Sequence, residues 1–359
     1  MNLHGSTFLA RNRKNVYVLI VHIASIPLAK TTVRGTISCK DDNNMREAAD
    51  TMGNCLGIDI GGTSIKWALI SNDYRVLERG DFPTKFASSQ EVIGAIAAVA
   101  EPLSGQYECV GVSAPGGIDT TDPDGTIHRG GALTYMDGCP LGRELRERLN
   151  VPVAVINDGK ACAQGEYAAG ALAGSTVGVV LAIGTGIGGG VVLDGRVLDG
   201  AHCFASEFSF LLNNAANGIQ RGANTFSTTN AWTGLRAFVL KEMGRADDPA
   251  YQQADGREIF TWIDAGDEAA NRGLASYANL FAGQLFNLQC TLDPDVIAIA
   301  GGISCHDALI AAIQHAVDTR YAEYRGPLAN APKPNVVRAT LGNDANLYGA
   351  AMQAFRLTA

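Results

Sequence analysis

Two adjacent polar residues, Asn157 and Asp158, follow the short apolar segment 153–156. Such a segment is typical of a buried strand, and open α/β folds place ligand-binding groups at the carboxyl ends of strands. A carboxylate there can act as a general base that accepts the proton of a hydroxyl group while its oxygen attacks phosphorus. The spacing leaves a second interpretation equally open, in which Asp158 only caps the helix expected from Ala161 onward.

Two glycine-rich bends could bind an anion. Glycine has no Cβ and tolerates positive φ, so the backbone N–H groups of such bends can approach a phosphate closely. The alternative is that both are tight hairpin turns, which explains one bend more readily than it explains the pair. The residues concerned are Gly61, Gly62 and Thr63 in the first bend and Gly184, Thr185, Gly186 and 187–190 in the second.

The second bend also matches the pattern G-x-G-x-x-G, through Gly184, Gly186 and Gly189. A dinucleotide fingerprint must open a helix whose N-terminus meets the pyrophosphate. Here the apolar residues 191–193 precede Asp194-Gly195, which predicts a strand and a tight turn and disfavours a dinucleotide site. The P-loop pattern G-x-x-x-x-G-K-[ST] does not occur in the sequence.

The elements that must position these residues alternate between strands and helices, which predicts an α/β fold. A strand, a glycine bend and a second strand occur twice, so we expect two similar α/β halves facing one cleft. Further strands are predicted at 109–113, 153–156 and 296–300, and helices at 91–103, 141–149, 161–173, 271–292, 307–321 and 347–355.

Composition excludes several other classes of protein. The 359 residues carry 28 Lys and Arg against 36 Asp and Glu, a net charge of −8 that disfavours nucleic acid as a partner. The eight cysteines form no C-x-x-C pair, and we expect reduced thiols in a cytoplasmic protein. The apolar run 16–29 is too short to span a bilayer, and His22 and Pro27 interrupt it as a secretory signal. We therefore expect no membrane partner.

In residues 1–53, polar and charged residues cluster from Lys40 to Asp50, and the strand and helix patterns of the rest begin only afterwards. This part is predicted to be an N-terminal extension outside the fold. Our hypothesis is that the functional polypeptide begins at Met52 and that the upstream part is a start-site artefact. Deletion of residues 1–51 should then leave folding intact.

Six motifs in register make residues 55–357 resemble the ROK family of bacterial sugar kinases and repressors. The resemblance implies the two-domain actin-like, hexokinase-like ATPase fold, with ATP and sugar in the interdomain cleft. It places the N-terminal α/β domain at 54–170 and the C-terminal one at 171–359, with the last helix packing back on the first domain. The motifs are Asp59-Ile60-Gly61-Gly62-Thr63 with Lys66, Ala114-Pro115-Gly116-Gly117, Asn157-Asp158, Gly184 to Gly190, Ala300-Gly301-Gly302-Ile303 and Leu341-Gly342-Asn343-Asp344-Ala345.

The resemblance also implies a role for each matching residue. Asp158 would be the base that deprotonates a sugar hydroxyl, and Asp59 would orient Mg²⁺ through its water. The expected sugar ligands are Asn157, Glu207, Gly116 and Gly117. The expected ATP-binding residues are Gly61, Gly62, Thr63 and Lys66 in the first phosphate loop, Gly184, Thr185 and Gly186 in the second, and Gly301 and Gly302 beside the adenosine.

The sequence departs from the family where zinc is expected. Glu207 aligns with the glutamate of the family segment G-E-x-G-H, but Phe210 stands where that segment has its histidine. No cysteine occurs in 211–230, where the cysteine-rich zinc loop should follow, so we expect no structural zinc. The chain thus resembles the zinc-free branch that includes β-glucoside kinases, and a less polar, open pocket end suits a substituted glycoside.

The predicted function is an ATP- and Mg²⁺-dependent kinase that phosphorylates the 6-hydroxyl of a β-glucoside or hexose, as a homodimer. A glucokinase or amino-sugar kinase of the same family is the nearest alternative. A sugar-responsive repressor is a rival from another class, but in 1–53 Pro27 and Gly35 leave no uninterrupted recognition helix. A third interpretation is a sugar-binding protein without turnover.

Overall fold

The computed structural model describes residues 8–12, 15–19, 53–131, 133–213, 224–324 and 326–358. Strands β1 (Phe8–Asn12) and β2 (Asn15–Leu19) pair antiparallel within a unit of residues 1–47, and residues 48–359 form the unit described from here on. Most of 1–53 is outside the described residues, so its place as an extension stays a prediction. No helix in the described part of the chain is long and apolar enough to cross a membrane.

The first five-stranded sheet contains the first glycine bend. Strand β3 pairs antiparallel with β4 and parallel with β6, and β6 pairs parallel with β7, so the carboxyl ends of β3, β6 and β7 lie at one edge. Asp59 and Asn157 stand at that edge. The strand order is β5 (Val76–Pro83), β4 (Ser64–Ile70), β3 (Cys55–Ile60), β6 (Cys109–Ala114) and β7 (Val153–Asn157).

The second sheet repeats this pattern around the second glycine bend. Strand β8 pairs antiparallel with β9 and parallel with β11, and β11 pairs parallel with β12. The prediction of two similar α/β halves is therefore confirmed. The strand order is β10 (Arg196–Val197), β9 (Ile187–Leu193), β8 (Val177–Ile183), β11 (Val296–Ala300) and β12 (Val336–Arg338).

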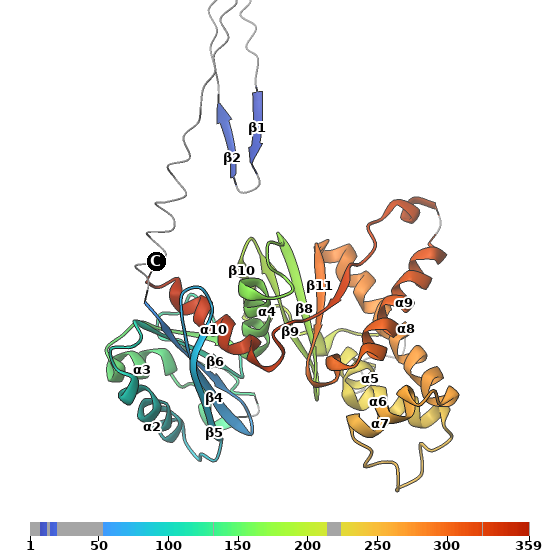
Figure 1. The fold of residues 1–359 in the computed structure, drawn as a ribbon, viewed down its shortest axis with the longest axis horizontal. Helices are drawn as coiled ribbons and strands as arrows, with labels where there is room; N and C mark the ends of the chain where they lie inside the picture. The colour runs from blue at the N-terminus through green and yellow to red at the C-terminus, as the bar shows by residue number, and fades with distance from the viewer. Residues whose placement is uncertain are drawn as a thin grey trace, which may run out of the picture. The chain divides into compact units, whose positions relative to one another are not determined.

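Helices cover both faces of each sheet because successive strand residues point to opposite faces. In the first sheet, Leu56 and Ile58 pack in one cluster with α2 (Ser89–Ala100) and α3 (Leu141–Leu149), while Cys55 packs with α10 (Ala345–Phe355). In the second sheet, α4 (Asp158–Ala169) covers one face, and α8 (Glu268–Leu292) and α9 (Asp307–Glu323) cover the other. Helices α4 and α10 thus lie between the sheets (Figure 1).

Three short helices and a set of 3-10 turns complete the described fold. The sequence patterns did not predict these helices, nor β5 and β12. Strand β5 is partly or fully exposed along its length, so it lacks the apolar signal of a buried strand. The helices are α5 (Phe226–Asn230), α6 (Trp232–Glu242) and α7 (Gly256–Asp264), and the turns are Glu101–Leu103, Thr134–Met136, Phe208–Phe210, Gly302–Cys305, Gly326–Asn330 and Gly342–Asp344.

Glycines allow the backbones of α4 and α10 to touch. A Cβ on Gly165 of α4 would overlap the carbonyl oxygen of Ala345, and a Cβ on Gly349 of α10 would overlap that of Ala161. Helix α10 also meets the first sheet at Gly111, where a Cβ would overlap the backbone of Ala350. The last helix is therefore packed against both α4 and the first sheet.

Candidate active site

A cavity of about 240 Å³ brings together residues from both halves of the fold. It is lined by Asp59 and Lys66 from the first sheet, by Asp158 from α4, and by Gly301 after β11. Gly188 of the second glycine bend also lines it, so four of the six sequence motifs meet at one place, although Asp59 and Gly301 are 242 positions apart in the chain. A fifth motif contributes Asn343.

Asn157, and not Asp158, caps helix α4. The Asn157 Oδ1 atom accepts the backbone N–H of Lys160 at 3.2 Å, while its Nδ2 donates to the Gly116 carbonyl at 2.9 Å. The interpretation of Asp158 as the helix cap is therefore wrong, since Asp158 is the first residue of the helix. Its Oδ1 atom accepts from Asn157 Nδ2 at 3.0 Å and from the Gly159 N–H at 2.8 Å.

The surroundings of Asp158 raise the pKa of its carboxyl group. The largest cause is desolvation, because protein closely surrounds a side chain that still opens into the cavity, and the negative charges of Asp59 and Glu207 add to it. Hydrogen bonds from Gly159 and Asn157 act in the opposite direction. A carboxylate with a raised pKa is a stronger base, which is what deprotonation of an alcohol requires.

Asp59 is a buried carboxylate held by two elements. Its Oδ1 atom accepts from Ser113 Oγ of β6 at 2.9 Å and from Asn346 Nδ2 of α10 at 3.0 Å. The other oxygen, Oδ2, has no hydrogen-bond partner among the described residues. Oxygen donors that leave room for water suit Mg²⁺, so this residue fits the place where the cation is expected.

The glycine bends present bare backbone toward open space. Each closes on itself, with Gly61 N–H donating to Ser64 at 3.1 Å and Gly184 N–H donating to Gly186 at 2.9 Å. Nothing lies within 4 Å of where a Cβ would stand on Gly62 or Gly188. The bends therefore leave space in which phosphate oxygens could reach backbone N–H groups.

The other expected ATP-binding residues also belong to this region. Gly301 has a φ of 95°, and a Cβ there would overlap the backbone of Ile183, whereas Gly302 faces open space. Lys66 Nζ donates to the Asn343 carbonyl at 3.5 Å, a long bond that a phosphate could replace. The bend carrying Thr63 is tied to the chain after β5, since the Thr63 carbonyl accepts the Thr84 N–H at 3.0 Å. These features fit a nucleoside triphosphate.

Asn157 and Arg129 form hydrogen bonds between the segments that carry the residues expected to bind sugar. Gly116, with a φ of 111°, accepts the Asn157 amide, and Gly117 pairs with His128 in an isolated β-bridge. The Arg129 guanidinium lies against Gly117 and donates to the His202 carbonyl at 3.4 Å. Glu207 follows five residues later in the chain, and its charge acts on Asp158.

Sequence reasoning missed a buried ion pair beside the candidate base. Lys160 Nζ lies 2.7 Å from Asp199 Oδ1, with side-chain exposures of 3% and 15%. The second oxygen of Asp199 accepts the N–H of Thr120 at 3.2 Å and also its hydroxyl. A lysine two residues after Asp158 was the available signal, but its partner lies 39 residues away.

Cys162 also lines the cavity. Burial, with the nearby charges of Glu166, Asp158 and Asp59, raises the pKa of its thiol to about 12. The thiol therefore stays protonated at neutral pH and offers no competing nucleophile.

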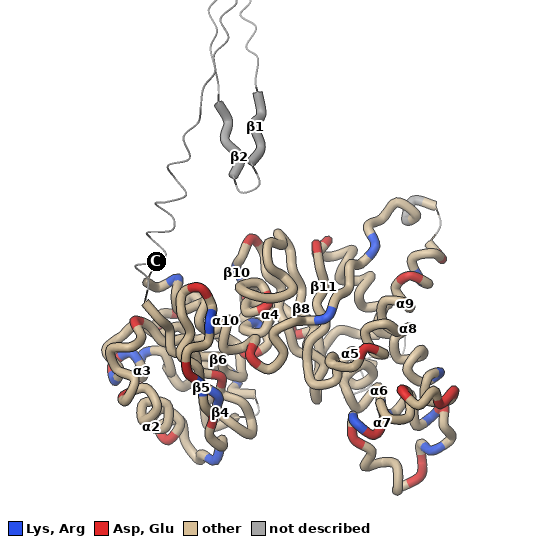
Figure 2. Tube along the Cα trace, in the orientation of Figure 1, with Lys and Arg blue, Asp and Glu red and all other residues tan. Residues whose placement is uncertain are grey.

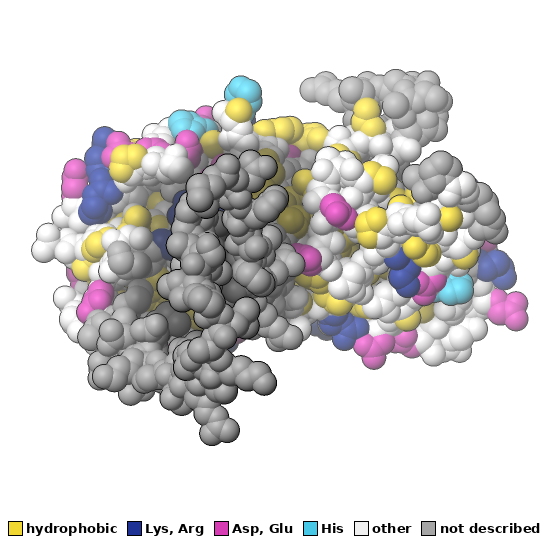
Figure 3. Space-filling model, turned by 90° about the horizontal axis from the view of Figure 1, so that it is seen from above, with side chains coloured by type: hydrophobic (Ala, Val, Ile, Leu, Met, Phe, Trp, Pro, Cys, Tyr) yellow, Lys and Arg dark blue, Asp and Glu magenta, His cyan; other side chains and the backbone are white. Residues whose placement is uncertain are grey.

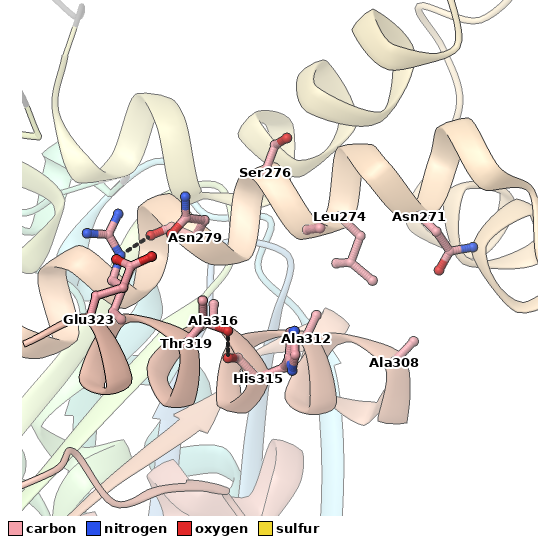
Figure 4. Close-up of a pocket in the computed structure, with 12 residues that line it drawn as sticks. Asn271, Leu274, Ser276, Asn279, Ala308, Ala312, His315, Ala316, Thr319 and Glu323 are labelled. Carbon is pink, nitrogen blue, oxygen red and sulfur yellow. Dashed lines mark hydrogen bonds between the residues drawn. The ribbon is translucent and has the colours of Figure 1, made fainter.

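A larger cavity of about 710 Å³ lies between α8 and α9 (Figure 4). Two of the polar side chains that line it bond to the helices themselves, since Arg320 Nε donates to the Asn279 carbonyl at 3.0 Å and Thr319 Oγ1 donates to the His315 carbonyl at 2.9 Å. None of the residues expected to bind sugar or ATP lines it.

The profile of the ROK family matches residues 55–356. The chain belongs to the ROK family. It is 32% identical over 313 residues to the bifunctional enzyme NanE/NanK of Brucella melitensis biotype 1, a match that covers 86% of this chain and 55% of that enzyme. The chain thus spans about half the length of that relative.

Two further proteins are matched over almost their whole length. The chain is 29% identical to the β-glucoside kinase of Klebsiella pneumoniae over 295 residues, 81% of this chain and 93% of that kinase. The ROK glucokinase of Streptomyces griseus, solved in complex with glucose and AMPPNP, superposes with a TM-score of 0.69 at 26% identity and covers 85% of this chain and 100% of its own. The hexokinase-like fold expected from the motifs is thereby confirmed.

The roles of the individual site residues stay predictions. So does the expected absence of structural zinc, because residues 214–223 of the segment in question are outside the described part of the chain.

Proposed function

We propose that this ROK-family sugar kinase transfers the γ-phosphoryl group of ATP to the 6-hydroxyl of a β-glucoside or hexose, with Asp158 as the general base. The observation that carries the proposal is the position of the Asp158 carboxylate. It opens into a cavity lined by both halves of the fold, and Asn157 relieves it of helix capping.

The residues divide the work as follows. Asp158 accepts the hydroxyl proton while the bond from that oxygen to phosphorus forms and the bond from phosphorus to the ADP oxygen breaks. The two glycine bends and Lys66 hold the phosphates, and Asn157 orients both the sugar and the base. When bound, Mg²⁺ neutralises phosphate charge, and Asp59 would hold it through water.

The choice of a β-glucoside rests on the sugar side of the site. Phe210 is a hydrophobic side chain at a position where a histidine would supply a polar contact, so that end of the pocket favours a substituted sugar. The β-glucoside kinase among the relatives supports this choice, while the glucokinase with bound glucose supports a plain hexose.

Measurement of ADP release by the full chain, with ATP and Mg²⁺, tests the proposal. The acceptors are glucose, fructose, N-acetylmannosamine, cellobiose and gentiobiose, with no sugar as the blank. Turnover on the disaccharides supports a β-glucoside kinase, whereas turnover on a single monosaccharide assigns the chain to that sugar instead. ADP release that is the same with and without every sugar would contradict a sugar kinase.

A further inference from the structure

Two phenylalanines beside Glu207 are exposed and touch each other. The ring centroids of Phe204 and Phe210 lie 5.6 Å apart, and the residues are 51% and 61% exposed. Within the described residues, only Leu77, Leu193 and Leu357 are comparably exposed large hydrophobic residues. On the face that Figure 3 shows, hydrophobic side chains mostly lie among polar and charged ones.

The fold itself does not need this pair. Phe208, on the same 3-10 turn as Phe210, is buried and packs in the core of the second half. Burying an aromatic side chain stabilises a protein relative to leaving that side chain in water. Phe204 and Phe210 make only part of this gain within the chain, so their exposed faces are available to a ligand.

The segment that carries the pair is tied to the sugar side of the site. The His202 carbonyl, two residues before Phe204, accepts from the Arg129 guanidinium at 3.4 Å, and this guanidinium lies against Gly117, an expected sugar ligand. Glu207 lies between the two phenylalanines in the chain. Its backbone carbonyl accepts a hydrogen bond from the Phe210 N–H at 3.1 Å. Each phenylalanine thus stands three residues from Glu207, an expected sugar ligand whose charge acts on Asp158.

We propose that Phe204 and Phe210 bind the aglycone of the substrate, a second pyranose ring or an aryl group attached to the sugar that is phosphorylated. This inference rests on the proposed function. An aryl ring can stack on the phenylalanines. A β-linked pyranose presents a face of C–H groups, and contact with the rings removes this apolar surface from water. Either ring fits the pair, whereas a methyl group is too small to cover it.

The test compares phenyl β-D-glucoside, cellobiose, methyl β-D-glucoside and glucose as acceptors for the wild type, Phe204→Ala and Phe210→Ala. A stacked aromatic contact predicts that each substitution lowers kcat/KM for phenyl β-D-glucoside relative to methyl β-D-glucoside by about three- to tenfold. Cellobiose should lose in the same direction. Phe210→Trp should retain the wild-type preference, and Leu77→Ala, a remote exposed control on β5, should leave it unchanged.

The outcomes separate this inference from the proposed function. The aglycone site alone is overturned if the wild type phosphorylates glucose and methyl β-D-glucoside but neither alanine substitution changes the ratio of kcat/KM for phenyl β-D-glucoside to kcat/KM for the other two sugars. An equal loss for all four sugars, or a change only in oligomeric state, overturns it as well by assigning the pair a structural role or an interface. A wild type inactive on every sugar rejects the proposed function and this inference together.

Discussion

At the residue scale, the candidate site depends on the fact that Asp158 does not cap helix α4. A carboxylate at the start of a helix is ordinarily used as a cap, because it can accept the free N–H groups of the first turn. Here Asn157 caps the helix and also donates to Asp158. Desolvation is the largest cause of the raised pKa of the Asp158 carboxyl group. The negative charges of Asp59 and Glu207 raise this pKa further.

Asp158→Asn should lower kcat by about 10²–10⁴-fold while sugar binding persists, since the amide keeps the shape but cannot accept the proton. A carboxyl group with a raised pKa binds its proton more tightly in the folded state than in the unfolded state. Stability is therefore lost as pH rises from the ordinary pKa to the raised one.

The same variant should accordingly melt at a higher temperature than the wild type at pH 7, with the gain shrinking below the ordinary pKa of about 3.9. Steady-state kinetics and calorimetry check both effects. Asp264→Asn, an exposed aspartate at the end of α7, is the matched control and should change neither. A near-normal kcat in Asp158→Asn would place the base elsewhere.

Glu207→Gln should move the acid limb of the kcat/KM profile to lower pH. The negative charge of Glu207 helps to raise the pKa of Asp158, so its removal lets Asp158 stay ionised in more acidic solution. If Glu207 binds the sugar, KM should rise as well. An acid limb that does not move would show that the two carboxylates are not coupled, or that the limb belongs to another group.

At the element scale, α4 and α10 pack through glycine. Gly165 and Gly349 each face a carbonyl of the opposite helix at a spacing that no Cβ fits. Helix α4 carries Asp158, and α10 carries the Asn346 amide that holds Asp59. The contact between these helices thus sets the relative position of the candidate base and the candidate Mg²⁺ ligand.

Gly349→Ala should destabilise the protein by about 1–3 kcal/mol, because the added methyl group forces the two backbones apart. Urea unfolding measures the change. Gly283→Ala in α8 is the matched control, since the nearest atom to its Cβ would be a guanidinium atom of Arg320 at 3.9 Å. The control should be neutral or stabilising by up to about 1 kcal/mol, as expected for a glycine in a helix interior. Equal stability of both variants would contradict the packing argument.

At the scale of the whole molecule, the Lys160–Asp199 pair links three separate segments. Lys160 stands in the first turn of α4, Asp199 follows β10 of the second sheet, and Thr120 follows β6 of the first. Figure 2 shows Lys and Arg interspersed with Asp and Glu over the described residues. Most of the ion pairs among these residues have one or both partners well exposed, which sets this buried pair apart.

Asp199→Ala should cost about 3–5 kcal/mol of unfolding free energy, because it leaves the buried Lys160 ammonium without its counter-charge. Chemical denaturation measures this cost. Asp318→Ala, which breaks the exposed pair with Lys333, is the control and should cost no more than about 1 kcal/mol. The double variant Lys160→Met, Asp199→Ala should recover much of the loss. A small loss in Asp199→Ala would show that water reaches Lys160.

The homodimer implied by the family resemblance also belongs to this scale. It stays a prediction, which sedimentation velocity of the purified chain checks.

The sequence by itself determined the alternation of strands and helices, the two strand–bend–strand units and the family. These are local signals: an apolar run such as Val296–Ala300 or a helical pattern such as Leu141–Leu149 reports its own burial, and both bounds agree with the structure. Glycine bends are equally local, because a missing Cβ is visible in the sequence.

Only the tertiary structure decided which residues meet. That Asn346 bonds to Asp59 from 287 residues away depends on how α10 packs on the first sheet. The partnership of Lys160 with Asp199 and the exposure of Phe204 and Phe210 beside Glu207 are of the same kind. Hydrogen bonds, ion pairs and burial depend on distances in space, and sequence spacing does not report those distances once the chain has turned back on itself.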